Sequence, residues 1–327
     1  MTAQETGADG ARGIVLELLD AVRAGGLLET GRPVVVMLSG GRDSTCLLDV
    51  AVSVAGVAAV SALHVNYGLR EQADADQRHC VSLCEQLGVA LDVERAAPAP
   101  VAGNVQAWAR ELRYDAAARL ARSRGADVAA GHTATDQVET ILYRLASSPS
   151  RRALLGMRAR EGNLIRPLLG FSREQTGDYC RARSLRWCED ESNDSDRYAR
   201  GRVRNELVPA LRRIHPGAER NLLAVAEVLR AEADVLDLLV DRELGGSRQL
   251  TLARLRELPT ALARLLVQRL ADDVAGRPMP GTARRLEDLL ALSESGTAHL
   301  DLPAGVRASA VNGMLSFGRT PAIEREP

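Results

Sequence analysis

The chain contains no lysine, so all 42 of its basic residues are arginine. This absence excludes every mechanism that depends on a lysine side chain of the protein: Schiff bases, lysine nucleophiles and the lysine of the ordinary phosphate-binding loop. A bias toward GC-rich codons explains the absence itself, and the exclusion holds whatever its origin.

Cysteine is scarce, and its spacing is informative. The chain has 5 cysteines, and no two of them form a C-x-x-C pair. We therefore expect buried free thiols rather than a metal site or an iron–sulfur cluster. The five are Cys46, Cys80, Cys84, Cys180 and Cys188.

Long apolar runs are absent as well. No segment approaches the ~20 apolar residues that span a bilayer, and the N-terminus lacks the basic start and apolar middle of a signal peptide. With a net charge of −1, the chain as a whole has no bias toward membranes or nucleic acids. We expect a cytoplasmic protein with no membrane partner.

Charge is nevertheless unevenly distributed. Residues 151–220 carry 16 arginines against 10 acidic residues, whereas the flanking parts of the chain carry more acids than arginines. A basic segment of this kind suits contact with a polyanion. A solvated helical face explains the same count equally well.

The first half of the chain alternates between two hydrophobic periods. Short apolar runs predict buried strands at 33–38, 58–65, 89–94 and 126–132. Segments with apolar residues at i, i+3 and i+4 predict helices at 44–55, 73–88 and 104–125. This alternation predicts an α/β fold with a doubly wound parallel sheet covered on both faces.

Polar clusters follow the predicted strands where each one ends. Such sheets bind ligands outside the carboxyl ends of their strands, so we expect these clusters to converge on one site. They are Ser39–Ser44, His64–Arg70, the segment leading to Asn104, and Gly131–Asp136.

The second half has a different character. From Asn221 the pattern predicts a long amphipathic helix followed by further short ones, which indicates a small helical domain. The end of the chain shows short apolar alternations around an Asn312-Gly313 turn, typical of a β meander. With 327 residues available, we divide the chain into domains at 1–215 and 216–327.

The sequence SGGRDS, from Ser39 to Ser44, joins the first strand to its helix. Adjacent glycines let the backbone turn tightly and present N–H groups, and the helix adds its positive N-terminus, so an anion is the natural occupant. The alternative is a plain strand–turn–helix junction capped by Asp43 or Ser44.

This stretch resembles the S-G-G-x-D-S signature of the PP-loop ATP pyrophosphatases, which have a Rossmann-like fold and activate substrates by adenylation. In that superfamily x is often lysine, and here Arg42 keeps the charge with a different geometry. Further motifs narrow the resemblance to tRNA(Ile)-lysidine synthetase across residues 34–220. They are HVNYGLR, GNVQAWARELRY, GHTATDQVETILYRL, LLGM, IRPLLGFSRE and WCEDESNDSDRYARGRVRNELVPAL.

Three departures from the family pattern stand out. Tyr67 replaces a frequent histidine, Gly201 lies within a stretch that usually reads R-N-R-I-R, and the glycine-rich segment before LLGM reads ASSPSRRA. These departures concern substrate contacts more than the chemistry.

The resemblance implies a reaction and its partners. ATP, with Mg²⁺, adenylates an oxygen of the wobble cytidine in the anticodon loop of isoleucine tRNA, and free L-lysine then displaces AMP to form lysidine. Residues 1–215 would be the PP-loop ATP-binding catalytic domain, and 216–327 a helical tRNA-binding or substrate domain with a terminal β segment. The oligomeric state stays open, with a dimer among the alternatives.

The resemblance also implies roles for individual residues. Nucleotide binding falls to Ser39, Gly40, Gly41, Arg42, Asp43, Ser44, His64 and His132. Asp43 and Asp136 are the candidate Mg²⁺ ligands, and Asp136 and Arg204 the candidate catalytic residues. The candidate substrate- and tRNA-binding residues are Arg110, Arg113, Glu139, Arg200 and Arg202.

Without the resemblance, structural interpretations compete with these roles. Asp136 would be a helix-dipole acid, Glu139 an exposed helix acid, and each histidine a satisfied polar-core residue. Arg110 and Arg113 would form salt bridges with acids such as Glu111 or Asp115. The alternating Arg200, Arg202 and Arg204 would be a solvated basic turn, whereas on a strand or loop they suit RNA or a triphosphate.

Two other functions remain. A tRNA thiolase of the same superfamily typically uses paired cysteines, which this chain lacks. A non-catalytic adenine-nucleotide-binding protein is the rival of another class. The ordered polar clusters and the basic segment 151–220 favour an enzyme over such a sensor.

Overall fold

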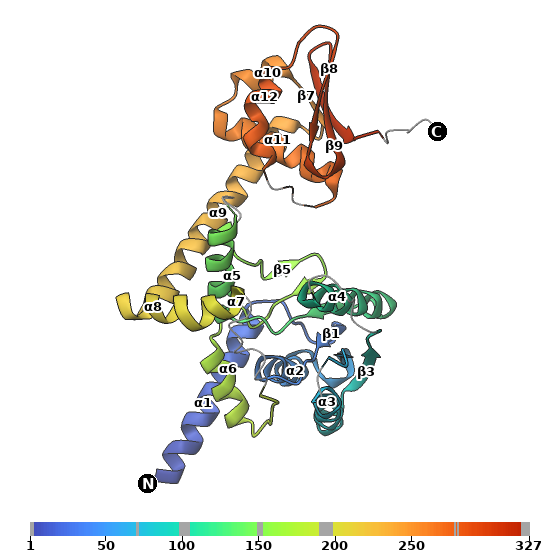
Figure 1. Cartoon of the computed structure of the whole chain (residues 1–327). Helices are drawn as coiled ribbons and strands as arrows, with labels where there is room; N and C mark the ends of the chain where they lie inside the picture. The colour runs from blue at the N-terminus through green and yellow to red at the C-terminus, as the bar shows by residue number, and fades with distance from the viewer. Residues whose placement is uncertain are drawn as a thin grey trace. The chain divides into compact units, whose positions relative to one another are not determined.

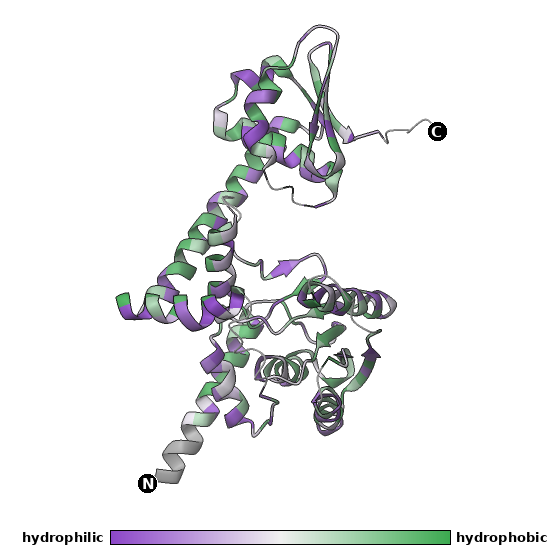
Figure 2. Ribbon diagram, in the orientation of Figure 1, coloured by the Kyte–Doolittle hydropathy of each residue, from purple (hydrophilic) through white to green (hydrophobic). Residues whose placement is uncertain are grey.

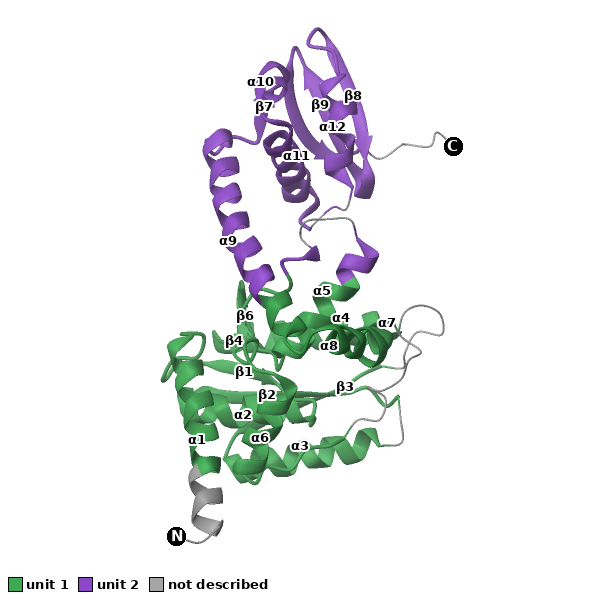
Figure 3. Cartoon of the chain, turned by 90° about the vertical axis from the view of Figure 1, so that its left-hand side faces the viewer, with its two compact units in different colours: residues 1–143, 156–223 green, residues 144–155, 224–327 purple. Residues whose placement is uncertain are grey.

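The computed structural model describes residues 3–69, 72–97, 105–148, 153–189, 199–277, 279 and 281–321. The chain forms two compact units (Figure 3). Unit 1 comprises Met1–Tyr143 and Gly156–Leu223, and unit 2 comprises Arg144–Leu155 and Ala224–Pro327. The division expected after residue 215 falls just before α9 (Ala218–Leu244), whereas the units divide within that helix.

Unit 1 is built on a six-stranded sheet in the order β3-β2-β1-β4-β6-β5. Its strands are parallel except for β5, which pairs antiparallel with β6. The predicted doubly wound α/β fold is therefore confirmed. The strands are β1 (Val34–Met37), β2 (Val60–Asn66), β3 (Ala90–Arg95), β4 (Asp127–Ala129), β5 (Arg160–Glu161) and β6 (Leu164–Ile165).

The position of β1 in the middle of the sheet explains why its sequence is a continuous apolar run. Val34 and Val36 belong to the core on one face of the sheet, whereas Val35 and Met37 belong to the core on the other. Because successive side chains of a strand point to opposite faces, a strand covered on both sides needs no polar positions.

Helices cover both faces of this sheet (Figure 1). Buried residues of α1, α2, α3 and α6 form the core on one face, and the alanines Ala116, Ala117 and Ala121 of α4 cover the other. These helices are α1 (Ala3–Ala24), α2 (Arg42–Ala55), α3 (Ala73–Leu87), α4 (Val105–Arg124) and α6 (Arg173–Ala182).

The remaining helices of unit 1 form a small separate cluster. Val138 and Leu142 of α5 pack against Val203 and Val208. These segments are α5 (Ala134–Ser147), α7 (Ala199–Arg202), a π-helical turn (Val203–Leu207) and α8 (Val208–Ile214).

Unit 2 combines short helices with a four-stranded antiparallel sheet in the order β7-β10-β9-β8. The expected meander is present, and Asn312 and Gly313, with φ of 48° and 76°, form the turn between β9 and β10. The elements are α10 (Leu252–Glu257), α11 (Thr260–Ala275), α12 (Leu286–Leu290), β7 (Gln249–Thr251), β8 (Thr297–Leu302), β9 (Val306–Val311) and β10 (Met314–Arg319).

Hydrophobic and hydrophilic residues alternate along α9, as expected for an amphipathic helix (Figure 2). Among the residues that the structure describes, no helix is both long enough and apolar enough to cross a membrane.

Candidate active site

A cavity of about 840 Å³ lies in unit 1 at the carboxyl ends of the central strands. Its lining includes Ser39, Tyr67, His132 and Asp136, so three of the four polar clusters expected at strand ends converge there. The fourth, the segment leading to Asn104, lies outside the described residues, as do residues 190–198 of the acidic stretch. The cavity wall continues through residues of α4, α6 and α7.

The Ser39–Ser44 loop has the geometry of an anion cradle. Gly40 has φ +83°, in the left-handed region that favours glycine, and a Cβ added there would lie 3.2 Å from Cys80 Sγ. Ser44 Oγ donates to the Gly41 carbonyl at 2.9 Å and lies 3.0 Å from Ser39 Oγ. The N-cap residue is Gly41, without a side-chain cap, so neither Asp43 nor Ser44 caps α2. The uncapped first turn leaves N–H groups for a ligand.

Gly131 shows how closely β4 approaches this loop. A Cβ at Gly131 would lie 3.1 Å from the backbone C and O of Asp43 and from the backbone N of Ser44. Few real Cβ atoms come so near to backbone, so any other residue at this position would push the start of α2 away by a few tenths of an ångström. The start of the GHTAT motif therefore packs directly on the cradle.

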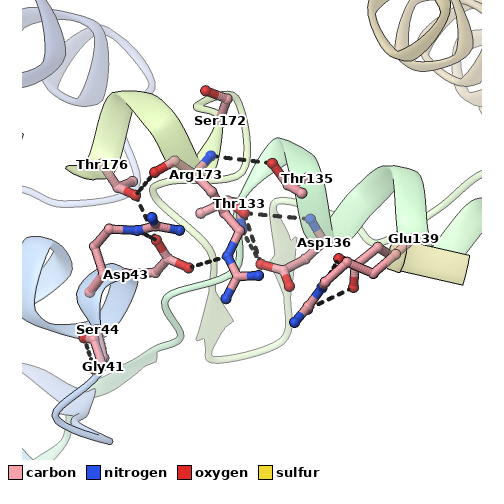
Figure 4. A network of polar contacts seen from close by, with 12 residues as sticks. Gly41, Asp43, Ser44, Thr133, Thr135, Asp136, Glu139, Ser172, Arg173 and Thr176 are labelled. Carbon is pink, nitrogen blue, oxygen red and sulfur yellow. Dashed lines mark hydrogen bonds and ion pairs between the residues drawn. The ribbon is translucent and has the colours of Figure 1, made fainter. Parts of the chain in front are cut away.

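The Asp43 carboxylate points away from its own helix and toward α6 (Figure 4). Thr176 Oγ1 donates to Asp43 Oδ1 at 2.6 Å, and Arg173 Nε lies 3.4 Å from Oδ2. Arg42 Nε also lies 3.3 Å from Oδ1. With a side chain only 14% exposed, Asp43 is held between cationic and hydroxyl donors at the cavity wall.

Asp136 and Glu139 lie in the first turns of α5, and both line the cavity. Asp136 Oδ2 accepts from the backbone N–H of Thr133 at 2.8 Å and from Thr133 Oγ1 at 2.9 Å (Figure 4). These hydrogen bonds fit the helix-dipole interpretation and also orient the carboxylate.

The alternative interpretation of Glu139 as an exposed acid is wrong. It is 2% exposed, and Arg204 donates to both of its oxygens, from Nε at 2.6 Å and from Nη2 at 3.0 Å. This is a bidentate, charge-assisted pair at the cavity wall.

The three arginines at 200, 202 and 204 lie on helical turns, so their expected placement on a strand or loop is wrong. Val203 and Val208 pack against α5, and this apolar contact stabilises a helix. At helical spacing Arg200 and Arg204 share a face, and both line the cavity, with Arg200 Nη2 donating to Thr140 Oγ1 at 2.8 Å. Arg202 is exposed and outside that lining.

Comparison with known proteins now adds to this geometry. A model of the PP-loop domain matches residues 16–211. A tRNA(Ile)-lysidine synthase from Symbiobacterium thermophilum is 36% identical to this chain over 93% of the chain and 70% of its own length. One from Thermus thermophilus is 35% identical over 86% of the chain and 56% of its own length. The chain belongs to the tRNA(Ile)-lysidine synthase family.

Two further facts bear on this membership. The chain spans only about half the length of several curated relatives, for example 48% of the lysidine synthase from Pseudomonas fluorescens. A solved structure with a similar fold is the U34-tRNA thiolase NcsA from Methanococcus maripaludis with its [4Fe-4S] cluster, at a TM-score of 0.57 and 17% identity. The match covers 67% of this chain and 80% of the thiolase chain, and it shows the fold alone.

Four of the five cysteines here are buried as expected, and Cys188 is partly exposed.

The two candidate site histidines of this lysidine synthase family member, His64 and His132, have different surroundings. His64 is buried, its Nδ1 lies 2.9 Å from the Leu38 carbonyl, and it does not line the cavity. His132 does line the cavity, and its buried Nδ1 has no hydrogen-bond partner among the described residues. The satisfied polar-core interpretation thus fits His64 better than His132.

The charged groups near His132 also distinguish it from His64. Burial, together with the guanidinium groups of Arg166 and Arg110, lowers the pKa of His132 to about 3. Burial also lowers the pKa of His64. His132 therefore offers the cavity a neutral ring at pH 7.

Arg110 and Arg113 also line the cavity. Their guanidinium carbons lie 4.6 Å and 5.8 Å from the centre of the Tyr114 ring. Within the described part of the chain, no ion pair joins them to Glu111 or Asp115. Their positive charge therefore faces the site rather than a neighbouring acid.

The sequence reasoning missed the site residues contributed by α6, Arg173 and Thr176. The signal for this helix is present in the S-x-x-Q sequence of Ser172 to Gln175, which forms a capping box. No local pattern indicates that Thr176 reaches Asp43, since the contact joins residues 133 positions apart.

Proposed function

We propose that this chain joins free L-lysine to the wobble cytidine of isoleucine tRNA at the expense of ATP, forming lysidine, AMP and pyrophosphate. The observation that carries the proposal is that one cavity contains the Ser39–Ser44 cradle, Asp136 and the Glu139–Arg204 pair. Membership of the lysidine synthase family supports the choice of reaction.

In this proposal the cradle binds the phosphates of ATP through the backbone N–H groups at the start of α2 and the hydroxyls of Ser39 and Ser44. An oxygen of the cytosine ring attacks the α-phosphorus, and pyrophosphate leaves. The lysine amine then attacks the activated carbon, the bond to the adenylated oxygen breaks, and AMP leaves. Arg204 stabilises negative charge in these steps, since its guanidinium lines the cavity.

Asp136 is the proposed partner of the incoming lysine amine. Its two hydrogen bonds with Thr133 both use Oδ2, which leaves Oδ1 outside the capping pair. A carboxylate in this position orients an ammonium group and accepts its proton on the way to the nucleophilic amine.

The chemistry of the donors also fits a divalent cation. Asp43 and Asp136 place carboxylates on the wall of the same cavity as the cradle, and oxygen ligands of this kind suit Mg²⁺. Bound there, Mg²⁺ would neutralise the charge of the polyphosphate.

To bind the anticodon loop of the tRNA, the site needs cationic groups for its phosphates and planar groups that stack on its bases. Arg110, Arg113 and Arg200 supply guanidinium groups to the cavity, and guanidinium planes bind phosphates and stack on unpaired bases. We propose Arg202, His132 and the domain formed by residues 216–327 as further contacts to tRNA or nucleotide. Because tRNA is the substrate, the proposed place of action is the cytoplasm.

Release of pyrophosphate tests the proposal. Wild-type protein with ATP, Mg²⁺ and isoleucine tRNA should release it, and Ser39→Ala and Asp43→Ala should each lower the rate at least tenfold by removing a cradle hydroxyl or a carboxylate of the site. Ser123→Ala, on the surface of α4, is the matched control and should keep the wild-type rate. Unchanged release in both cradle variants would contradict the site, and release without any dependence on tRNA would favour a different substrate.

A further inference from the structure

Helix α6 reaches into the active site through its first turn. Thr176, which is fully buried, donates its hydroxyl to Asp43 Oδ1 at 2.6 Å. Arg173, the first residue of α6, lies 3.4 Å from the other carboxylate oxygen, Oδ2. Figure 4 shows both side chains extending from α6 toward Asp43. The two oxygens of one carboxylate therefore have separate neighbours on a single helix.

The position of α6 is itself fixed by several contacts. The backbone N–H of Arg173 donates to Thr135 Oγ1 at 3.2 Å, which ties the start of α6 to the start of α5. At the other end, Tyr179 donates to the buried Asp49 of α2 at 2.7 Å, and Arg183 also donates to that carboxylate. Because α6 is anchored to both neighbours, its first turn is a rigid reference for the Asp43 side chain.

Asp43 would not take this orientation by itself. It lies at the second position of α2, where a carboxylate commonly turns back to the free N–H groups of its own helix. A carboxylate turned back in that way would compete with a phosphate for the same donors. The Thr176 hydroxyl offers a short, charge-assisted hydrogen bond in the opposite direction.

We propose that Thr176 is a positioning residue, which holds Asp43 Oδ1 so that the cradle stays open to phosphate and Oδ2 stays available to the divalent cation. The proposal rests on the proposed function, because it concerns how the same site takes up Mg²⁺ and ATP. Arg173 Nε lies 3.4 Å from the same Oδ2 at the cavity wall, so a cation bound there would share this oxygen with the guanidinium or displace it.

Binding of a non-hydrolysable ATP analogue, titrated with Mg²⁺ and measured by calorimetry without tRNA or turnover, tests this proposal. Thr176→Val keeps the shape of the side chain and removes the hydroxyl. It should raise the Mg²⁺ concentration that gives half-maximal binding by about tenfold, the effect of losing roughly one charge-assisted hydrogen bond. Thr176→Ser keeps the hydroxyl and should stay within about twofold of wild type.

Two controls separate positioning from stability. Thr282→Val changes another fully buried threonine, in unit 2, and should leave the Mg²⁺ dependence unchanged. In an Asp43→Asn background, Thr176→Val should add nothing further, because a residue that acts through Asp43 has no effect once that carboxylate is gone. If Thr176→Val does not fold, Thr176→Ala and Thr176→Ser give the same comparison at smaller volume.

The outcomes are distinguishable. A lowered melting temperature with the wild-type Mg²⁺ dependence, or an effect that persists fully with Asp43→Asn, would show a purely structural hydrogen bond and overturn the inference alone. Failure of the wild-type protein to bind the analogue at any Mg²⁺ concentration would overturn the proposed function, and the inference with it.

Discussion

At the scale of single residues, the Glu139 and Asp43 carboxylates of the cavity have partners before any ligand binds. Glu139 is paired with Arg204, and Asp43 lies between Arg42, Arg173 and the Thr176 hydroxyl. Such pairs hold the side chains in one geometry and reduce the rearrangement needed when substrate charge arrives. They also make the stability of the site sensitive to the loss of one partner.

His132 gives a pH-dependent prediction. Its folded-state pKa is lowered to about 3 from 6.5, so below pH 6.5 the unfolded state takes up the proton first and stability is lost as pH falls. The loss between pH 7.5 and pH 5 should be about 2 kcal/mol. His132→Gln should lose less stability than wild type over this interval by about that amount, measured by urea denaturation at both pH values. Equal losses in the two proteins would mean that His132 is not held neutral.

Arg204 gives a second prediction at this scale. Removing it by Arg204→Ala would leave Glu139 buried without its partner, a change that typically costs about 3–5 kcal/mol. The exposed Arg202, two residues away, is the matched control, and Arg202→Ala should cost less than about 1 kcal/mol. Denaturant unfolding measures both, and similar costs for the two variants would contradict the helical placement that separates them.

At the scale of elements, the sequence predicted best where one physical cause acted alone. The strand at Val34–Met37 and the helices α2, α3 and α4 follow directly from apolar period. Helix α1 was missed because Gly7, Gly10 and Gly13 lower its intrinsic propensity, which is offset by the packing of Leu18 and Val22 in the core.

The placement of Arg200, Arg202 and Arg204 on a strand or loop was predicted wrongly for a related reason. The i, i+2, i+4 spacing of Arg200, Arg202 and Arg204 resembles the alternation of a strand. The apolar residues that decide for a helix, Val203 and Val208, act only through their contact with α5. Tertiary packing therefore overrides the local pattern, and with it changes which arginines can share a site.

The contact between the LLGM motif and α5 predicts how a substitution at Gly156 changes stability. Gln137 of α5 accepts from the backbone N–H of Met157 at 2.6 Å and donates to its carbonyl at 2.8 Å. Gly156, with φ +63°, would place a Cβ 2.6 Å from Gln137 Oε1. Gly156→Ala should therefore destabilise the protein by about 2–4 kcal/mol, through left-handed strain together with this clash.

Gly162 is the matched control for that change. It has nearly the same φ, +61°, and nothing lies within 4 Å of an added Cβ. Gly162→Ala should cost only the conformational strain, about 1–2 kcal/mol. Thermal unfolding of both variants measures the difference, and equal costs would mean that Gln137 does not hold the motif in place.

At the scale of the whole molecule, the balance of charges along the sequence does not show which arginines are paired in the fold. Several arginines of the basic segment 151–220 are paired within unit 1: Arg160 with Asp127, Arg183 with Asp49, Arg204 with Glu139 and Arg212 with Glu219. Ion pairs between segments distant in sequence cannot be read from a local balance. Among the described residues, six arginines line the cavity, and three of them, Arg173, Arg200 and Arg204, belong to the segment 151–220, whereas Arg42, Arg110 and Arg113 come from α2 and α4.

The general place of the site could still be predicted from the sequence, because parallel strands carry their carboxyl ends to one edge. Ser39, Tyr67 and Asp136 meet in one cavity for that reason. The partners that orient them, such as Thr133 and Thr176, depend on side-chain packing across the fold and have no signature of their own.

Formation of lysidine is the central claim, and one incubation tests it directly. The protein is mixed with ATP, Mg²⁺, radiolabelled lysine and total tRNA, and the tRNA is then digested to nucleosides and separated. The account predicts that label appears as lysidine, only in isoleucine tRNA, only with ATP, and not with Asp43→Ala. Consumption of ATP with no labelled nucleoside, or label in tRNAs other than isoleucine tRNA, would contradict it.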